Sequence, residues 1–380
     1  MEYRELGKTG RSVSVIGLGG EHLDGKPYKQ VKETIDAALE YGVNIIDVFM
    51  PGTEIRENIA KALGKRRKDV TIQGHIGSTD INQQYDISRD MPTVKKYFEN
   101  MLRVYGGYID VGMLFFVDSE KDYKNVFETG FVEYAQRLKA NGDIAHIGFS
   151  SHNPKTSIKV INTGVPETMM FCINPAFDML PSEEDALDHF EKGFKTEMFK
   201  GIDPGRAELY KLCSQKQIGI TVMKTLCAGK LISKEHTPFA EAMTVPQCIH
   251  YALSRPAVAS ALLGCKTRAE VEEAMRYLSL DDSEKDYSDV ISSVKSDFRG
   301  SCVYCSHCQP CPAGIDIAAV NRYLDIARLD TEHVPPGVCL HYKSLEHHGD
   351  ECTDCGNCED RCPFGVPVVA NMAEAEKFLR

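Results

Sequence analysis

Two cysteine runs near the end of the chain constrain its folding more than any other feature. The first reads Cys302-x-x-Cys305-x-x-Cys308-x-x-Cys311-Pro312, and the second reads Cys352-x-x-Cys355-x-x-Cys358-x-x-x-Cys362-Pro363. Runs that end in Cys-Pro at this spacing are typical of cubane iron–sulfur clusters, because several thiolates must converge on one inorganic core. Disulfide frameworks belong to small secreted domains, and zinc ribbons use pairs of Cys-x-x-Cys. The sequence therefore predicts two 4Fe-4S clusters, bound by all eight cysteines, and single-electron transfer.

The pairing of cysteines with clusters has two alternatives. In ferredoxins with two clusters, the fourth cysteine of each run binds the other cluster. The same crossing here would give one cluster Cys302, Cys305, Cys308 and Cys362, and the other Cys352, Cys355, Cys358 and Cys311. The first run has two residues instead of three before its Cys-Pro, so the spacing does not decide between crossed and uncrossed ligation.

Length and charge exclude several classes of protein. A chain of 380 residues suits a large domain with a smaller one, and 42% hydrophobic with 26% charged residues is typical of soluble globular proteins. A formal net charge of −11 argues against a nucleic-acid partner. No apolar run approaches the ~20 residues of a membrane span, and no signal peptide is visible. The six other cysteines are scattered, which is typical of reduced thiols, so we expect a cytoplasmic protein from an anaerobic setting.

From residue 11 to about 280, apolar strand patterns alternate with amphipathic helical patterns. The expected strands are Val13–Leu18, Val43–Val48, Val70–Ile76, Ile109–Val117, Ile144–Phe149, Thr168–Ile173, Gly219–Met223 and Ala259–Leu263. The expected helices include Lys29–Tyr41, Glu54–Leu63, Thr93–Tyr105 and Arg268–Leu278. Eight strand–helix alternations predict an α/β fold, a closed (β/α)8 TIM barrel, with a doubly wound open sheet as the alternative.

Three domains follow from this pattern. Residues 1–280 form the barrel, residues 281–300 an acidic helical connector, and residues 301–380 a mainly α-helical, ferredoxin-like domain with two clusters. In that last domain we predict helices over Ile317–Leu329 and Val368–Leu379. The His- and Pro-rich stretch from His333 to His348 is expected to be a loop.

Several segments resemble aldo/keto reductases. They are Tyr3–Gly20, Ile144–Asn153, Thr221–Lys224 followed by Gly229-Lys-Leu, and Leu262–Lys266. The cysteine runs are similar to those of the subgroup of this family that carries a ferredoxin-like tail. The resemblance spans nearly the whole chain and implies the barrel fold and a reductase ancestry.

The resemblance also implies a catalytic Asp, Tyr, Lys and His, of which this chain keeps one. Asp47 matches the Asp, no Tyr follows it in Met50–Gly52, His75 stands where the Lys would be, and Phe115 where the His would be. Barrel enzymes work at the carboxyl ends of the strands, where Asp47 and His75 would be neighbours. We predict that they form a catalytic proton-donating pair. The alternative is that His75 is a hydrogen-bonded residue in a vacated pocket.

For a nicotinamide cofactor, the resemblance implies a different set of residues. Ser150, Ser151 and Asn174 would meet the carboxamide, although the family's Gln is absent from Met169–Ile173. Lys266, Thr267 and Arg268 would meet a phosphate at the N-terminus of the last barrel helix, where backbone N–H groups favour anions. NADP(H) is therefore the alternative cofactor.

Other polar residues follow strands and are candidates for the barrel mouth: Glu21, His22, His152 and Asp178. His152 also precedes a helix and would serve as a structural residue at its start. A zinc site formed by His22, His75 and His152 has the ligand number of a catalytic zinc but no supporting spacing.

Three functional hypotheses remain. The first is an iron–sulfur oxidoreductase that reduces a small substrate, or a second cofactor, at the barrel mouth, with ferredoxin or another redox protein as donor. The second is an NAD(P)H-dependent aldo/keto-type reductase with accessory clusters. The third is a non-catalytic electron-transfer or scaffold subunit.

Overall fold

The structure, a computed structural model, describes residues 1–80, 86–181, 184, 186–199, 201–292 and 300–380. It contains two compact units that interleave along the chain. The first unit comprises Met1–Ile173, Ile218–Thr225 and Val258–Leu278, and the second comprises Asn174–Gln217, Leu226–Ala257 and Ser279–Arg380. The limits of the three domains expected from the sequence stay a prediction, and residues 293–299 of the expected connector lie outside the described residues.

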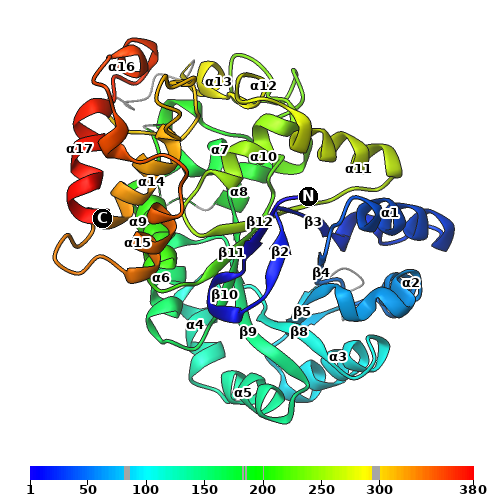
Figure 1. The fold of residues 1–380 in the computed structure, drawn as a ribbon. Coiled ribbons are helices and arrows are strands. Elements are labelled where there is room, and N and C mark those ends of the chain that lie inside the picture. The colour runs from blue at the N-terminus through cyan, green and yellow to red at the C-terminus, as the bar shows by residue number, and fades with distance from the viewer. Residues whose placement is uncertain (81–85, 182–183, 185, 200, 293–299) are drawn as a thin grey trace. The chain divides into compact units, whose positions relative to one another are not determined.

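A closed barrel of eight parallel strands forms the first unit (Figure 1). Its strands are β3 (Ile16–Gly19), β4 (Ile45–Val48), β5 (Thr71–Ile76), β8 (Ile109–Leu114), β9 (Ile144–Ser151), β10 (Thr168–Cys172), β11 (Gly219–Met223) and β12 (Val258–Leu263). The pairing of Ala261–Leu263 with Ile16–Leu18 closes the ring. The predicted (β/α)8 barrel is confirmed, and the open-sheet alternative is wrong.

An antiparallel hairpin of β1 (Tyr3–Glu5) and β2 (Ser12–Ser14) precedes the barrel. The expectation of one strand over Val13–Leu18 is therefore wrong. At Ser14 the chain leaves the hairpin, because its backbone N–H binds Asn44 Oδ1 at 2.7 Å and its hydroxyl binds the Ile16 carbonyl at 2.7 Å. The hairpin region contributes Leu6 and Val13 to an apolar cluster whose other buried members are Ile45, Val111, Met113, Met170, Ala259 and Leu262.

The helices of the first unit lie outside the strands (Figure 1). They are α1 (Tyr28–Glu40), α2 (Thr53–Leu63), α3 (Met91–Val104), α4 (Glu120–Phe127), α5 (Phe131–Asn141), α6 (Pro154–Asn162) and α11 (Arg268–Met275), with 3-10 turns η1 (Gly7–Thr9), η2 (Gly20–Leu23), η3 (Gly64–Asp69) and η6, which starts at Arg276. A short pair, β6 (Ser78–Thr79) and β7 (Asp86–Ile87), follows β5. Ser119 caps α4 and Asn153 caps α6 through their side chains, which fixes the loops after β8 and β9.

Helices make up the regular structure of the second unit. They are α7 (Pro175–Asp178), α8 (Ala186–Lys192), α9 (Pro204–Gln215), α10 (Val245–Leu253), α12 (Asp282–Lys285), α13 (Ser288–Ser292), α14 (Ile317–Ala327), α15 (Pro336–Lys343), α16 (Asn357–Arg361) and α17 (Val368–Leu379), with η4 (Thr196–Met198), η5 (Cys227–Gly229) and η7 (Gly349–Glu351). Residues 301–380, all of which the structure describes, contain no strand. Among the described residues, no helix has the length and apolar character needed to span a membrane.

Helices α14 and α17 pack against each other between and after the cysteine runs. Asn371 Nδ2 donates to Asn321 Oδ1 at 2.6 Å, and Arg328 Nη2 donates to Asn371 Oδ1 at 2.8 Å. Both helices were expected from the sequence. The loop expected over residues 333–348 is wrong, because α15 occupies its centre. Pro336 stands in the first turn, where its missing N–H costs nothing, and Val338 and Tyr342 are buried on one face.

Gly219 at the start of β11 offers a test of this packing. A Cβ at this position would lie 2.4 Å from the backbone nitrogen of Gly7 and 2.5 Å from the carbonyl carbon of Leu6. Backbone atoms cannot move aside as a side chain can, so Gly219→Ala is expected to lower the free energy of unfolding by roughly 1–3 kcal/mol. Thermal unfolding followed by circular dichroism would measure this loss.

The matched control is Gly337→Ala in α15. Its new Cβ would meet only the end of the Gln217 side chain, at 3.4 Å, so the melting temperature should stay constant or rise. Equal melting temperatures for Gly219→Ala and the wild type would contradict the proposed contact.

Candidate functional site

A carboxylate–imidazole pair lies at the carboxyl ends of β4 and β5. Register pairing places Asp47 beside Gln73, and His75 is two residues further along β5, so it points to the same face as Gln73. His75 Nε2 lies 2.8 Å from Asp47 Oδ1, and Gln73 Nε2 donates to the same oxygen at 3.2 Å. Asp47 and His75 are 1% and 2% exposed. The structure brings the two predicted residues together, and their role as proton donors stays a prediction.

The bond to Asp47 decides which nitrogen of His75 is available for chemistry. In the neutral imidazole, a carboxylate at Nε2 favours the tautomer that carries its proton there. Nδ1 then has the lone pair, and it is buried without a hydrogen-bond partner among the described residues. The arrangement therefore leaves Nδ1 as the atom that can accept and return a proton.

Aromatic rings surround this pair. The Phe115 ring meets the imidazole edge-to-face at 5.2 Å between centroids, and Phe49 meets it at 6.0 Å. Phe49 and Phe115 stack on each other at 5.9 Å. Phe115 stands where the resemblance implies a catalytic His, so a polar group has been exchanged for an apolar wall. Electrostatic interactions are stronger in such surroundings than in water.

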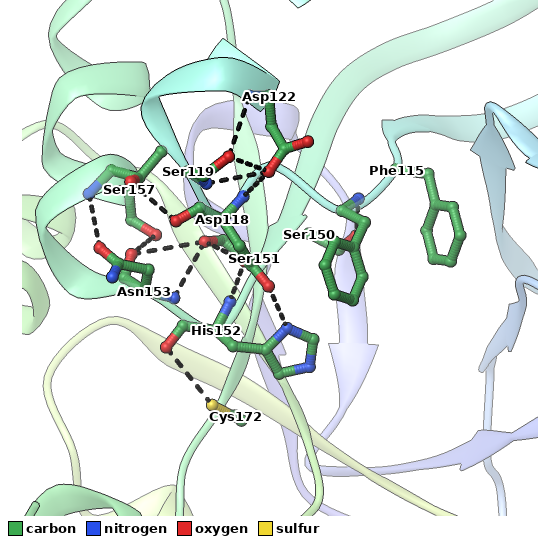
Figure 2. A network of polar contacts seen from close by, with 12 residues as sticks. Phe115, Asp118, Ser119, Asp122, Ser150, Ser151, His152, Asn153, Ser157 and Cys172 are labelled. Atoms are coloured by element: carbon green, nitrogen blue, oxygen red, sulfur yellow. Dashed lines mark hydrogen bonds and ion pairs between the residues drawn. The ribbon is translucent and has the colours of Figure 1, made fainter. Parts of the chain in front are cut away.

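A second carboxylate–imidazole pair lies after the next two strands (Figure 2). His152 Nδ1 is 2.8 Å from Asp118 Oδ2, while the Ser151 hydroxyl and the His152 backbone N–H donate to Asp118 Oδ1 at 2.8 and 2.6 Å. Burial raises the pKa of Asp118, but the imidazole and these hydrogen bonds outweigh burial, so its pKa lies below the ordinary value. Sequence reasoning did not identify this pair, although Asp118 and His152 follow neighbouring strands.

The backbone between the two pairs is held in an uncommon conformation. Phe116 has a φ of 58°, in the left-handed region that bulky residues rarely adopt at a cost of about 1–3 kcal/mol. Arg89 Nη2 donates to the carbonyls of Phe115 and Phe116 at 2.7 and 2.9 Å, and the Phe116 N–H binds Ser150 Oγ at 2.9 Å. The Phe116 ring lies 5.2 Å from the His152 ring and 6.0 Å from that of Phe115. A continuous aromatic row thus joins the two imidazoles.

The residues expected to bind a nicotinamide carboxamide have other partners. Ser150 Oγ accepts from Phe116, and Ser151 Oγ donates to Asp118 and accepts from the Asn153 N–H at 3.2 Å. Asn174 belongs to the second unit, where its Oδ1 accepts from the Phe177 N–H at 3.0 Å and caps α7. Each of these three side chains is therefore engaged in hydrogen bonds that fix the conformation of neighbouring segments.

The phosphate side is better preserved. Thr267 caps α11, and Thr267 and Arg268 line a cavity of about 410 Å³ with Pro27, Lys29, Gln30, Glu33 and Thr34. The Lys266 carbonyl accepts from Gln30 at 2.9 Å and from Thr34 at 3.0 Å. Arg268 binds Glu40 at 2.8 Å and Glu272 at 3.5 Å, and these carboxylates compete with a phosphate. The residues therefore fit NADP(H) in part.

The structure does not support two further candidates for the barrel mouth. Among the described residues, no group of three His, Cys, Asp or Glu side chains is arranged to hold one metal ion, so the zinc site of His22, His75 and His152 is not formed. Asp178 is fully buried in the second unit, where it binds Arg206, Tyr210 and Tyr251. Thiolates around a cubane are spaced by the cluster core, so a single-ion geometry is not the criterion for the cysteines.

The cysteine runs meet in the second unit. Cys308 and Cys311 of the first run line one cavity with Cys352, Cys355 and Cys358 of the second run. The other walls are apolar: Pro310, Pro312, Ile315, Ile317, Val368, Val369 and Met372. Burial raises the pKa of the Cys305 and Cys308 thiols to about 12, and the nearby Cys362 sulfur contributes to both shifts. These neighbourhoods match the crossed arrangement of ligands.

Both runs also share a backbone shape. The residue two positions after the first cysteine is left-handed in each run, Tyr304 with φ 59° and Asp354 with φ 53°. The residue four positions after it is left-handed as well, Ser306 with φ 63° and Gly356 with φ 73°. Three of these four are not glycine, so local preference does not explain the conformation. Two loops with different side chains and the same twist, each presenting thiols, fit two similar cubane clusters.

Comparisons with known proteins agree with this fold. The model of the aldo/keto reductase family matches residues 15–243, which is more than half of the chain. An aldo-keto reductase of Bacillus halodurans in its holo form has 18% sequence identity and a TM-score of 0.56, covering 75% of this chain and 94% of its own. A Pseudomonas aeruginosa protein assigned to the aldo-keto reductases has 17% identity and a TM-score of 0.54, covering 73% and 96%.

The two cysteine runs lie beyond the end of the family match. A comparison with curated proteins gave no significant match. The matched segment contains Asp47, His75, Asp118 and His152, so both carboxylate–imidazole pairs stand on the family's own scaffold. The chain belongs to the aldo/keto reductase family and is an oxidoreductase of that family.

Proposed function

We propose that this chain is an iron–sulfur oxidoreductase of the aldo/keto reductase subgroup with a ferredoxin-like tail. It reduces a small molecule, or a second cofactor, at the barrel mouth with electrons supplied through two 4Fe-4S clusters. The observation that carries the proposal is the exchange of the family's catalytic residues for the Asp47–His75 pair in a chain that presents eight cysteines in two similar loops.

Ordinary carbonyl reduction has lost its acid in this chain. General acid catalysis contributes typically ~100- to 10,000-fold, and the family's Tyr and Lys are absent from their positions. His75 replaces the Lys and keeps contact with Asp47 at 2.8 Å. A chain selected only as a scaffold would not need a buried imidazole with a carboxylate on one nitrogen and a free lone pair on the other, which argues against the scaffold hypothesis.

Protons are the part of the reaction that the barrel residues supply. A two-electron reduction of a double bond adds two electrons and two protons. His75 can donate one proton, with Asp47 stabilising the imidazolium and holding the ring in place. The His152–Asp118 pair can donate the other, and each imidazole takes up a proton again before the next turnover. The apolar rings of Phe115 and Phe116 lie between the two donors.

The cysteines supply the redox centre. When bound, 4Fe-4S clusters exchange electrons one at a time. Cys355 is exposed, which suits electron delivery by ferredoxin or another redox protein. The remaining six cysteines form no disulfide and five of them are buried, which supports a reducing cytoplasmic location: Cys172, Cys213, Cys227, Cys248, Cys265 and Cys339.

An NADP(H)-dependent reductase is the second candidate function. Family membership and the cavity at Thr267 and Arg268 favour it. The engaged side chains of Ser150 and Ser151 count against it, because a carboxamide would have to displace their hydrogen bonds to Phe116 and Asp118.

Pairs of cysteine substitutions test the crossed ligation. Because Cys311 and Cys355 belong to the same cluster, Cys311→Ser combined with Cys355→Ser should remove one cluster and leave half of the iron. Cys311→Ser combined with Cys302→Ser should remove both. Iron and sulfide content per chain after anaerobic reconstitution distinguishes the two outcomes, and the opposite result would establish uncrossed ligation.

The electron donor can be identified from cluster absorbance. In the anaerobic reconstituted protein, dithionite and reduced ferredoxin should bleach the absorbance near 400 nm, a region typical of iron–sulfur centres, whereas NADPH and NADH should not. Bleaching by a pyridine nucleotide would instead favour the NADP(H)-dependent reductase. Absence of iron from every preparation would reject both the iron–sulfur oxidoreductase and the NAD(P)H-dependent reductase with accessory clusters.

Substitution of the two histidines tests proton donation. With an acceptor that takes up protons, His75→Gln should slow oxidation of the dithionite-reduced protein by ~100- to 10,000-fold, and His152→Gln should also slow it. Ferricyanide accepts an electron without a proton, so its rate should not change. His146→Gln is the matched control, because His146 pairs with Glu167 at 3.0 Å elsewhere on β9. Equal slowing with ferricyanide would show damage to the redox centre instead.

A further inference from the structure

A buried arginine of the second unit forms no ion pair within the described part of the chain. Arg255 is 2% exposed and follows α10. Its Nε donates to the Tyr251 carbonyl at 3.2 Å, and its Nη2 donates to the hydroxyls of Ser254 and Tyr287 at 3.0 and 2.8 Å. All of these acceptors are neutral. Within the described part of the chain, no carboxylate lies at ion-pair distance from Arg255, and Nη1 is buried without a hydrogen-bond partner.

Asp178, the neighbouring buried carboxylate, attracts Arg255 at a distance but forms its ion pair with Arg206. Asp178 is fully buried, and its Oδ1 binds Arg206 Nη1 at 3.3 Å and the Tyr210 hydroxyl at 2.5 Å. Its Oδ2 accepts from the Tyr251 hydroxyl at 2.9 Å. Arg206 is itself 2% exposed, so Asp178 balances that arginine. One positive charge therefore remains in this buried group. A buried charge is strongly unfavourable unless hydrogen bonds and an opposite charge offset it.

The contacts of Arg255 point to the source of that opposite charge. Its Nη2 also donates to the carbonyl of Val303, which lies between Cys302 and Cys305. The Tyr287 hydroxyl donates to the same carbonyl at 2.7 Å. The guanidinium lies over the ring of Tyr304 at 5.1 Å, the left-handed residue directly before Cys305. Arg255 thus holds the loop that presents the first two cysteines.

We propose that Arg255 is the buried counter-ion of the cluster bound by Cys302, Cys305, Cys308 and Cys362. The inference rests on the proposed function, because it requires that cluster. Four thiolates outweigh the positive charge of a cubane core, so the assembled cluster is an anion, and reduction adds a further negative charge. Burial of Cys305 makes that added charge unfavourable. A fixed cation beside the loop offsets the effect and raises the reduction potential, as surrounding charge and hydrogen bonds do for such clusters.

An anaerobic redox titration of the reconstituted full chain, followed by electron paramagnetic resonance, tests the proposal. The variant that combines Cys311→Ser with Cys355→Ser, which should lack the other cluster, identifies the signal of the first. Arg255→Gln should shift the reduction equilibrium of the first cluster about tenfold or more toward the oxidised form, which is about 59 mV for a one-electron couple. Arg255→Lys keeps the charge and should remain within about tenfold of the wild type.

Two further variants make the test independent of any one substitution. Asp178→Asn removes a negative charge and leaves Arg206 uncompensated as well. The added positive charge should shift the reduction equilibrium of the first cluster toward the reduced form, opposite to Arg255→Gln. Arg361→Gln is the matched control. Arg361 donates to the Cys308 and Pro310 carbonyls at 3.0 and 2.9 Å but is exposed, so solvent screens its charge and the shift should stay under about threefold.

The outcomes separate the two proposals. An unchanged potential in Arg255→Gln, or an equal fall in Arg255→Lys, would overturn the counter-ion role while normal iron content left the cluster proposal standing. Failure of the wild-type chain to bind iron would overturn the proposed function itself.

Discussion

Closure of the barrel by β12 and β3 is the constraint on which the first unit depends. Because all eight strands are parallel, closure brings every carboxyl end to the same mouth. Asp47 and His75 come from one pair of neighbouring strands, and Asp118 and His152 follow the next pair. Residues up to 34 positions apart are therefore joined by direct hydrogen bonds. The same closure buries them, so each imidazole needs a carboxylate partner.

The two units show the same physical rule with different results. At the barrel mouth two buried imidazoles face carboxylates: His75 has Asp47, and His152 has Asp118. In the second unit Asp178 balances one arginine and leaves Arg255 in excess. The cysteine loop beside Arg255 would carry the missing negative charge once its thiols are thiolates bound to a cluster. Charge balance thus connects the helical network of α7, α9 and α10 to the first cysteine run.

Local patterns explain why much of the fold could be predicted. Strand and helix periodicity located all eight barrel strands, and the order of strands placed Asp47 beside His75. The errors have local causes. Prolines and histidines in residues 333–348 concealed α15, whose buried Val338 and Tyr342 provide the helical face. The single strand expected at Val13–Leu18 is divided by the hydrogen bonds of Ser14. Asp118 escaped notice because it lies in a loop, where no periodicity identifies a side chain.

The sequence by itself determined the barrel architecture, the family resemblance and the two cysteine runs, because periodicity and ligand spacing are properties of short segments. Beyond the Asp47–His75 pair, only the tertiary structure decided which polar groups meet. The assignment of Ser150 and Ser151 to hydrogen bonds with Phe116 and Asp118, the joining of Cys311 to the second run, and the excess charge at Arg255 all depend on contacts between distant segments. Burial then sets the energetic consequence, because a charge or hydroxyl removed from water must find its partner within the fold.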